Sequence, residues 1–321
     1  MRRNESAQGF ENPKLAFLFP GQGSQYVGMG RHLAEEYPEA RRSFDEADAA
    51  LGYALSKLCF EGPEEDLRKT ENTQPALLAV SIAALRVLRE LGYEPGLVAG
   101  HSLGEYSALV AAGSLDFAGA LRLVQKRGRY MQEAVPQGVG AMAALLKLPE
   151  GRLQHVIDQA AQGEVVTAAN FNSPDQVVIA GHAGAVQRAI ELAKAAGAKR
   201  AVLLPVSAPF HCPLMRPAQE RLRADLDSTA FKDLRVPLIN NWQAQEITTA
   251  QEARQGLFEQ IPNPVLWTES IRGIANRGIA RFIEVGAGSV LLGLCRSINP
   301  ALQGAKFGEP ADLEKLRTPL A

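Results

Sequence analysis

Apolar residues follow two different spacings along the chain, one typical of buried strands and one typical of amphipathic helices. Short apolar runs bounded by proline or glycine, "LAFLFP" at 15–20 and "GLVA" at 96–99, predict strands. Longer segments with apolar residues at helical spacing predict helices at 31–50 and 75–91. Strands that alternate with helices are typical of α/β proteins, so we predict an α/β fold with a parallel sheet.

The region from about 139 to 207 has its own order of predicted elements: strand, helix, strand, strand, helix, strand. The segments are "GAMAALL", "PEGRLQHVIDQAA", "VVTAANF", "QVVIAG", "AGAVQRAIELAKAAG" and "RAVLLPVS". This βαββαβ order is the ferredoxin-like pattern. We therefore predict an inserted ferredoxin-like subdomain at 137–208, within a large catalytic domain formed by 1–136 and 209–321.

Composition and charge limit the classes of function. The chain has 321 residues, of which 46% are hydrophobic, enough for a sizeable core. Its 34 basic and 35 acidic residues nearly cancel, which gives no support to nucleic acid or an anionic membrane as partner. Cys59, Cys212 and Cys295 are widely spaced and form no C-x-x-C, so we expect neither a disulfide framework nor a zinc site. No apolar stretch resembles a signal peptide or a membrane span, and we expect a cytoplasmic protein.

The stretch "GHSLGE" at 100–105 lies between a predicted strand and a predicted helix. A G-x-S-x-G sequence at such a turn is typical of a nucleophile elbow, in which the flanking glycines let the backbone pass closely while the serine hydroxyl is exposed. The alternative is a glycine-bounded turn in which Ser102 only caps the following helix.

A serine nucleophile needs a base, and the chain has five histidines. His32 and His155 lie in charged helical stretches, where we expect solvent exposure, and His182 follows a strand of the insert. His101 adjoins the serine, and neighbours at an elbow point in different directions. His211 lies in the proline-bounded loop "PVSAPFHCPLM", where the two domains must meet, and is the candidate base. Its alternative role is that of an ordinary loop histidine.

No acid in the sequence is an evident partner for the histidine. Asp158, Asp175 and Glu191 precede His211 but lie in the predicted insert. A backbone carbonyl can orient an imidazole in the same way, and the loop "FEQIPNPVLW" could present one.

Helical spacing separates one arginine from its neighbours in "LRLVQKRGRYMQEAV". Arg127 shares a helix face with Val124 and Met131, which predicts an inward side chain. A buried guanidinium needs a partner, which is either an internal carboxylate or the carboxylate of a ligand. The remaining charges form a stripe that we expect in water: Arg122, Lys126, Arg129 and Glu133.

Six sequence blocks in order carry a resemblance that extends from about Leu15 to Ile298. The blocks are "FPGQGSQ", "GHSLGE", "RGRYMQEAVPQGVGAM", "NFNSPDQVVIAG", "VSAPFH" and "EVGAGSVLLGL". Together they resemble the malonyl-CoA:acyl carrier protein transacylase family. The resemblance implies an α/β-hydrolase-like core with a ferredoxin-like insert. It also implies ping-pong transfer of a malonyl group from malonyl-CoA to acyl carrier protein through a malonyl-serine, with no metal or bound cofactor.

The resemblance also implies roles for individual residues. Ser102 is the nucleophile, His211 the base, and Arg127 the clamp on the malonyl carboxylate. The backbone N–H groups of Gln22 and Leu103 form the oxyanion hole.

Three further positions belong to the same implied site. The main-chain carbonyl of Gln260 orients the histidine, Phe210 crowds the α-carbon of the acyl group, and Met131 joins the substrate pocket. The run "INNWQAQEI" departs from the usual family pattern. We expect this departure to touch no catalytic position; it bears on the outer wall of the pocket and leaves the contacts with pantetheine open.

Carrier docking is predicted from charge. Acyl carrier proteins of this system are generally acidic, so positive charge should gather near the mouth of the site at Lys199, Arg200 and Arg296. Scattered solvated charges are the alternative. Two other functions remain open on sequence grounds: a serine esterase or thioesterase, and a catalytically silent module that binds a carrier protein.

Overall fold

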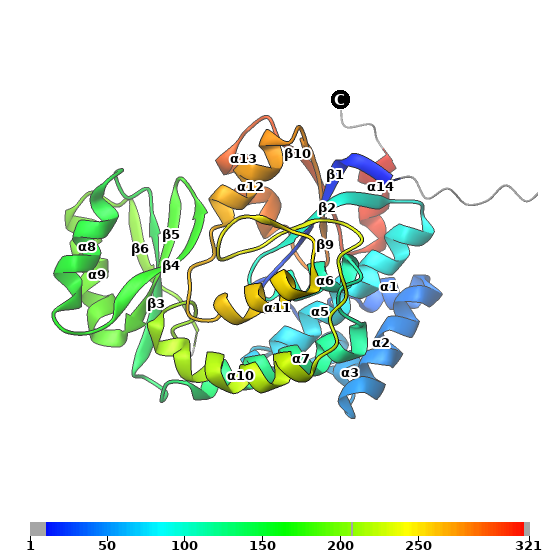
Figure 1. Cartoon of the computed structure of the whole chain (residues 1–321), viewed down its shortest axis with the longest axis horizontal. Coiled ribbons are helices and arrows are strands. Elements are labelled where there is room, and N and C mark those ends of the chain that lie inside the picture. Colours follow the sequence, from blue (N-terminus) through cyan, green and yellow to red (C-terminus); the bar gives the residue numbers. More distant parts are fainter. Residues whose placement is uncertain (1–10, 207, 318–321) are drawn as a thin grey trace, which may run out of the picture.

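Two β-sheets organise the chain in the computed structural model, which describes residues 11–206 and 208–317 (Figure 1). The larger sheet has six strands in the order β10-β9-β1-β2-β7-β8, all parallel except β8. Its strands are β1 (Glu11–Phe19), β2 (Glu94–Gly100), β7 (Leu238–Ile239), β8 (Glu246–Ile247), β9 (Arg281–Val285) and β10 (Gln303–Phe307).

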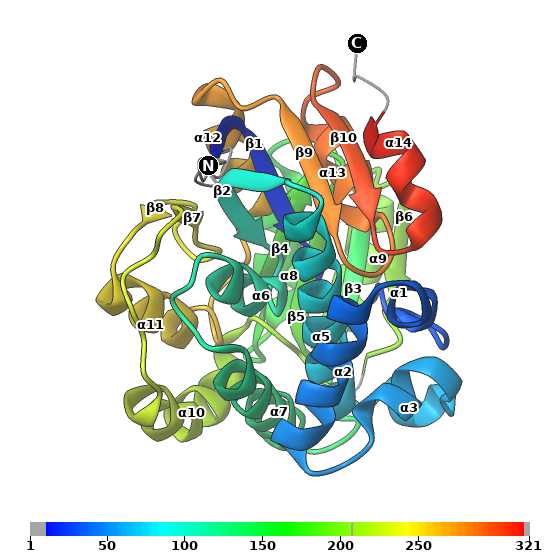
Figure 2. The ribbon, with the colours of Figure 1, turned by 90° about the vertical axis from the view of Figure 1, so that its right-hand side faces the viewer.

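Helices surround this sheet (Figure 2). They are α1 (Arg31–Glu36), α2 (Pro38–Leu51), α3 (Leu55–Glu61), α4 (Glu64–Leu67), α5 (Thr70–Glu90), α6 (Gly104–Ala111), α7 (Phe117–Glu133), α10 (Arg216–Ser228), α11 (Ala250–Glu259), α12 (Trp267–Asn276), α13 (Val290–Ile298) and α14 (Leu313–Arg317), with 3₁₀ turns η1 (Pro213–Met215) and η2 (Pro310–Asp312).

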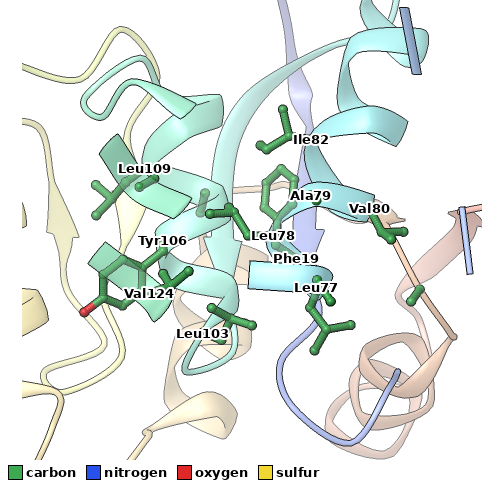
Figure 3. Packing of buried hydrophobic residues seen from close by; sticks show 14 of the residues in the cluster. Phe19, Leu77, Leu78, Ala79, Val80, Ile82, Leu103, Tyr106, Leu109 and Val124 are labelled. Atoms are coloured by element: carbon green, nitrogen blue, oxygen red, sulfur yellow. The ribbon is translucent and has the colours of Figure 1, made fainter. Parts of the chain in front are cut away.

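Both faces of the larger sheet are buried, as expected for parallel strands. Successive side chains of β1 point to opposite faces. Phe17 and Phe19 pack into a core with α2, α5, α6 and α7, part of which is drawn in Figure 3. Ala16 and Leu18 pack into a second core with α12 and α13. The serine strand β2 therefore lies between two layers of helices.

The smaller sheet is antiparallel, with the order β4-β5-β3-β6. Two helices cover one of its faces (Figure 1) and share a separate apolar core with it. Its elements are β3 (Gly140–Leu146), α8 (Arg152–Ala161), β4 (Val166–Ser173), β5 (Gln176–His182), α9 (Ala183–Ala195) and β6 (Arg200–Leu203). The βαββαβ order predicted for this region is present.

Strand β4 joins the smaller sheet to the larger half of the molecule. Phe171 N donates to Val265 O at 2.9 Å, and Val265 N donates to Ala169 O at 2.9 Å. Thr268 Oγ1 donates to Phe171 O at 3.0 Å. The two halves are thus connected by backbone hydrogen bonds as well as by the chain itself.

Two predicted helix boundaries were wrong. The helix expected over 31–50 is two helices, because Tyr37 has an extended backbone (φ −115°, ψ 119°) before Pro38, and a residue before proline disfavours the helical region. The helix expected to begin at Pro75 begins at Thr70 and continues through the proline.

Candidate active site

The turn between β2 and α6 places Ser102 at the carboxyl end of the parallel sheet. Its φ is 52°, a left-handed conformation that non-glycine residues seldom adopt. The flanking residues must be glycines because there is no room for a side chain at either position. A Cβ on Gly100 would lie 2.0 Å from the Gly104 carbonyl, and a Cβ on Gly104 would lie 2.0 Å from Phe19 O. The turn therefore has the strained geometry expected of a nucleophile elbow.

His211 is the histidine that meets Ser102. Its Nε2 lies 2.7 Å from Ser102 Oγ, and its Nδ1 lies 2.9 Å from the main-chain oxygen of Gln260. His211 also has a positive φ, 58°, and is almost completely buried. A carbonyl that accepts from Nδ1 leaves Nε2 free to accept the serine proton. A backbone carbonyl thus occupies the place that an acid holds in a Ser-His-Asp triad.

Electrostatics favour the neutral imidazole. Burial, with the neighbouring Arg127 guanidinium as a second cause, lowers the pKa of His211 to about 3. His211 is therefore uncharged near neutral pH and able to accept a proton.

Arg127 points inward, as its helix position predicts, and is buried beside the serine. Nη2 donates to Ser102 Oγ at 3.1 Å and to Gln260 Oε1 at 2.7 Å, and Nη1 donates to Gln74 Oε1 at 2.9 Å. The guanidinium also lies 5.3 Å from the ring centre of Tyr106. In the described part of the chain no carboxylate lies within ion-pair distance of Arg127. Its hydrogen-bond partners are neutral, which leaves its charge available to an acidic ligand.

The side chain of Gln260 connects several parts of the site. Besides accepting from Arg127, it donates through Nε2 to Ser102 O at 3.0 Å and to Glu105 Oε2 at 2.7 Å. Glu105 is completely buried, and burial raises the pKa of its carboxyl group to about 7.

The run "INNWQAQEI" contains none of the residues predicted to be catalytic, but it contacts the serine turn through Asn241. Asn241 within it accepts a hydrogen bond from Ser102 N at 2.6 Å and donates to Gly100 O at 2.7 Å. It thereby ties both sides of the turn together, because its side chain carries a donor and an acceptor.

A cavity of about 550 Å³ opens in front of Ser102. Gln22, Leu103, Met131 and Phe210 all line it. Within the described residues, the backbone N–H groups of Gln22 and Leu103 donate to no other protein atom. They are thus available to a bound group.

The smaller sheet also contributes residues to the wall of the cavity. Met142 and Ala144 of β3, Val178 of β5, and Asn170 and Asn172 of β4 line it. The "VSAPFH" motif passes from β6 to His211, and Ser207 within it lies outside the described residues.

The other histidines have separate partners. His101 Nε2 lies 2.8 Å from Asn172 Oδ1, and its ring meets that of Trp267 edge to face at 5.4 Å. His182 accepts from the backbone of Val165 at 2.9 Å. His32 and His155 are exposed, as predicted.

The charged residues that the sequence singled out lie at the surface, apart from the buried Arg127. The stripe expected in water is exposed. Lys199 and Arg200 line a second cavity of about 610 Å³ together with Val290 and Leu294, which also line the cavity of Ser102. Arg296 is exposed on α13, the helix that carries both of these apolar residues.

Sequence reasoning missed four contributors: Gln74, Glu105, Asn241 and the side chain of Gln260. All four are polar and almost completely buried. Of the four, only Gln74 could have been predicted as buried from the sequence, because it directly precedes the apolar run of a long helix.

The structure adds three further findings. In the part of the chain it describes, no cluster of three or more histidine, cysteine or acidic side chains is placed to hold a metal ion. Over the same residues, no helix is both long and apolar enough to span a membrane. Cys59, Cys212 and Cys295 are buried and form no disulfide.

Comparison with known proteins assigns the chain to a class. A family model described as "Acyl transferase domain" matches residues 16–303, which is most of the chain. The match makes the protein an acyltransferase.

Individual relatives narrow this class. The malonyl CoA-acyl carrier protein transacylase of Escherichia coli is 50% identical over 299 residues, covering 93% of this chain and 97% of that protein. The crystal structure of an acyl carrier protein S-malonyltransferase from Vibrio cholerae matches with a TM-score of 0.92 and 48% identity, over 95% of this chain and 100% of that one. A malonyl-transacylase solved in complex with a type II PKS acyl-carrier protein matches with a TM-score of 0.92 and 47% identity, over 94% of this chain and 98% of that one. The chain belongs to the malonyl CoA-acyl carrier protein transacylase family.

Proposed function

We propose that this protein transfers the malonyl group of malonyl-CoA to the phosphopantetheine thiol of an acyl carrier protein, through a malonyl ester of Ser102. The observation that carries the proposal is the meeting of three groups in one cavity. Ser102 Oγ lies 2.7 Å from His211 Nε2 and 3.1 Å from Arg127 Nη2. The names of the relatives support the same donor and acceptor. The product would supply extender units for fatty acid or polyketide synthesis.

The first half-reaction acylates the enzyme. Ser102 Oγ attacks the thioester carbon while its proton moves to His211 Nε2. The negative charge on the carbonyl oxygen is stabilised by the N–H groups of Gln22 and Leu103. Collapse of the tetrahedral intermediate breaks the carbon–sulfur bond, and the departing sulfur takes the proton from His211. Coenzyme A leaves and the malonyl ester remains.

The second half-reaction reverses these roles. The phosphopantetheine thiol gives its proton to His211 and attacks the ester carbon. The ester bond breaks, and Ser102 Oγ recovers the proton from His211. The whole sequence is therefore ping-pong, and each step uses only side chains and amides of this chain. We propose accordingly that no metal or bound cofactor takes part.

Arg127 gives the site its preference for a dicarboxylic acyl group. Its guanidinium would pair with the free carboxylate of the malonyl group, close to the ester at Ser102. Met131 and Phe210 would bound the space around the acyl carbons, since both line the cavity.

Several broader features belong to the same proposal. The larger sheet would correspond to an α/β-hydrolase-like core formed by 1–136 and 209–321, and the smaller to a ferredoxin-like insert at 137–208. The buried, unbridged cysteines are compatible with a cytoplasmic location. An acidic carrier protein would dock beside Lys199, Arg200 and Arg296, because the cavity lined by Lys199 and Arg200 shares Val290 and Leu294 with that of Ser102, and Arg296 is exposed on the same helix as those two apolar residues.

Intact-protein mass spectrometry tests the proposal. Mixing the protein with malonyl-CoA should add the mass of one malonyl group, and later addition of carrier protein should remove it. The Ser102→Ala variant should gain no mass. Persistent labelling of that variant would place the nucleophile elsewhere. Loss of the label to water at the same rate with and without carrier protein would indicate a hydrolase.

A further inference from the structure

Glu105 lies directly behind the reacting groups and takes no part in the transfer steps. It occupies the first turn of α6, three residues after Ser102, and is completely buried. No basic group in the described part of the chain lies within ion-pair distance of it. Its Oε2 accepts from Gln260 Nε2 at 2.7 Å and from Asn241 N at 3.1 Å. Burying a carboxylate is costly, so the burial of Glu105 needs a functional explanation.

The amide of Gln260 has two ends of opposite hydrogen-bonding character, and its direction decides what Arg127 meets. In the observed direction, Oε1 accepts from Arg127 while Nε2 donates to Glu105 and to a main-chain carbonyl. In the reversed direction, an NH₂ group would face a guanidinium, which only donates. The amide oxygen would then face two acceptors. The acceptors supplied by Glu105 and by the Ser102 carbonyl therefore select the observed direction, and Glu105 makes the shorter of the two hydrogen bonds.

This selection does not depend on the charge of Glu105. Both donors approach Oε2, whereas Oε1 is buried and has no hydrogen-bond partner among the described residues. Burial raises the pKa of the group to about 7, and a proton bound near that pH would reside on Oε1. Oε2 continues to accept from both donors in either state.

The same glutamine also faces the base. Its main-chain oxygen lies 2.9 Å from His211 Nδ1, while its side chain reaches Arg127. Anchoring the side chain at Glu105 thus steadies one residue that contacts both the base and the clamp.

We propose that Glu105 is a positioning residue that acts through Gln260 to aim the Arg127 guanidinium at the acyl carboxylate. The inference rests on the proposed function, because its consequence is a preference for malonyl over an acyl group that has no carboxylate. Loss of the acceptor at Glu105 would remove the shorter of the two hydrogen bonds that hold Gln260 Nε2, and would loosen the amide oxygen that holds Arg127 Nη2.

Two substitutions at Glu105 separate its hydrogen bond from its charge. Glu105→Ala removes the acceptor and should lower the ratio of kcat/KM for malonyl-CoA to that for acetyl-CoA about ten-fold, chiefly through KM for malonyl-CoA. Glu105→Gln keeps an oxygen at the position of Oε2 and should leave the ratio within about three-fold of the wild-type value. Glu105→Leu, which fills the space without an acceptor, makes the same test if the alanine variant does not fold.

Glu284 provides a matched control. It is also a completely buried glutamate, but its carboxylate accepts from the backbone N–H groups of Leu291 and Leu292 at the start of α13. Glu284→Ala should lower the melting temperature, as Glu105→Ala should, yet preserve the malonyl to acetyl ratio.

A double-mutant cycle tests the route through Gln260. In a Gln260→Leu background, Glu105→Ala should cause no further fall in the ratio, because the connecting amide is already absent. An unchanged ratio in Glu105→Ala, an equal fall in Glu284→Ala, or additive effects in the cycle would overturn the inference. Failure of the wild-type protein to acquire a malonyl group would instead overturn the proposed function.

Discussion

The two sheets contribute to one cavity in different ways. From the larger sheet and its connections come Ser102, Arg127 and His211, which would carry the reaction. From the smaller sheet come wall residues such as Met142 and Val178. The comparison suggests that the reacting groups come from the larger half alone, whereas both halves shape the cavity that would hold the substrate.

The two halves of the molecule also differ in which polar residues they bury. Within the described part of the smaller sheet and its helices, the buried polar residues are neutral, namely Asn170, Asn172 and Ser173. The larger half buries ionisable groups: Glu105, Arg127, His211, Glu284 and Asp312. Burial shifts the pKa values of Glu105, Arg127 and His211, and perturbed ionisation is common at functional sites, which agrees with a reacting centre on the larger half.

The largest effect should come from removing the base. His211→Ala should slow acylation by malonyl-CoA by roughly 10²–10⁴-fold, the usual contribution of a general base. Single-turnover mass spectrometry measures the rate. Val178→Ala, in the part of the cavity wall that the smaller sheet supplies, should change the acylation rate far less. If His101→Ala were the more damaging histidine change, the base would have been assigned wrongly.

The second prediction concerns stability and pH. The pKa of Glu105 is raised from 4.5 to about 7, so the folded state binds the extra proton between these values. This contribution to stability is present below pH 4.5 and is lost as pH rises through 7. The unfolding free energy of the wild type relative to Glu105→Gln should therefore fall by roughly 3 kcal/mol across that range, at about 1.4 kcal/mol per pKa unit.

Denaturant titrations of both proteins at several pH values measure this difference. His211 has a lowered pKa, so its contribution has the opposite sign: it is present above pH 6.5 and lost as pH falls toward 3. The contribution of His211 is the same in the wild type and in Glu105→Gln, so it cancels in the difference between their unfolding free energies. Parallel stability profiles would show that Glu105 does not ionise in this range.

Arg127 allows a sharper test of which half selects the acyl group. Arg127→Ala should reduce kcat/KM for malonyl-CoA roughly ten- to hundred-fold and spare acetyl-CoA, since only malonyl brings a carboxylate. Lys126→Ala, on the exposed side of the same helix, is the matched control. Equal losses with both substrates would make Arg127 a structural residue.

The smallest effect is expected at two exposed charges, Lys199 before β6 and Arg296 on α13. Changing Lys199 and Arg296 to Glu should raise KM for carrier protein a few-fold, because interactions between exposed charges contribute little free energy. The increase should be larger at low salt, where these charges are screened less. Loading from malonyl-CoA should be unchanged. Carrier kinetics that stay the same would place docking on another surface.

The sequence predicted the elements better than the contacts between them. The six elements of the smaller sheet follow their apolar patterns closely, because each pattern is local. Arg127 was placed correctly on the inward face for the same reason. Apolar spacing did not predict the break at Tyr37, because the break comes from the steric effect of Pro38 on the residue before it.

The polar contacts behind Ser102 could not be predicted in this way. Asn241 and Gln260 are far from Ser102 in the sequence, and no spacing rule joins a short strand end to a loop more than a hundred residues away. Glu105 follows the motif serine closely, yet on sequence alone a glutamate in a first helical turn is expected to face water and favour the helix dipole. Its burial depends on a partner that only the fold supplies.

The hydrogen bonds between β4 and the segment at Val265 have a consequence for how the molecule unfolds. Separating the smaller sheet would expose the backbone of Ala169 and Phe171 and break their bonds to the larger half. His101 would lose Asn172 in the same event, at the residue next to Ser102. We therefore expect one cooperative transition on heating, with no intermediate in which one sheet is folded and the other is not.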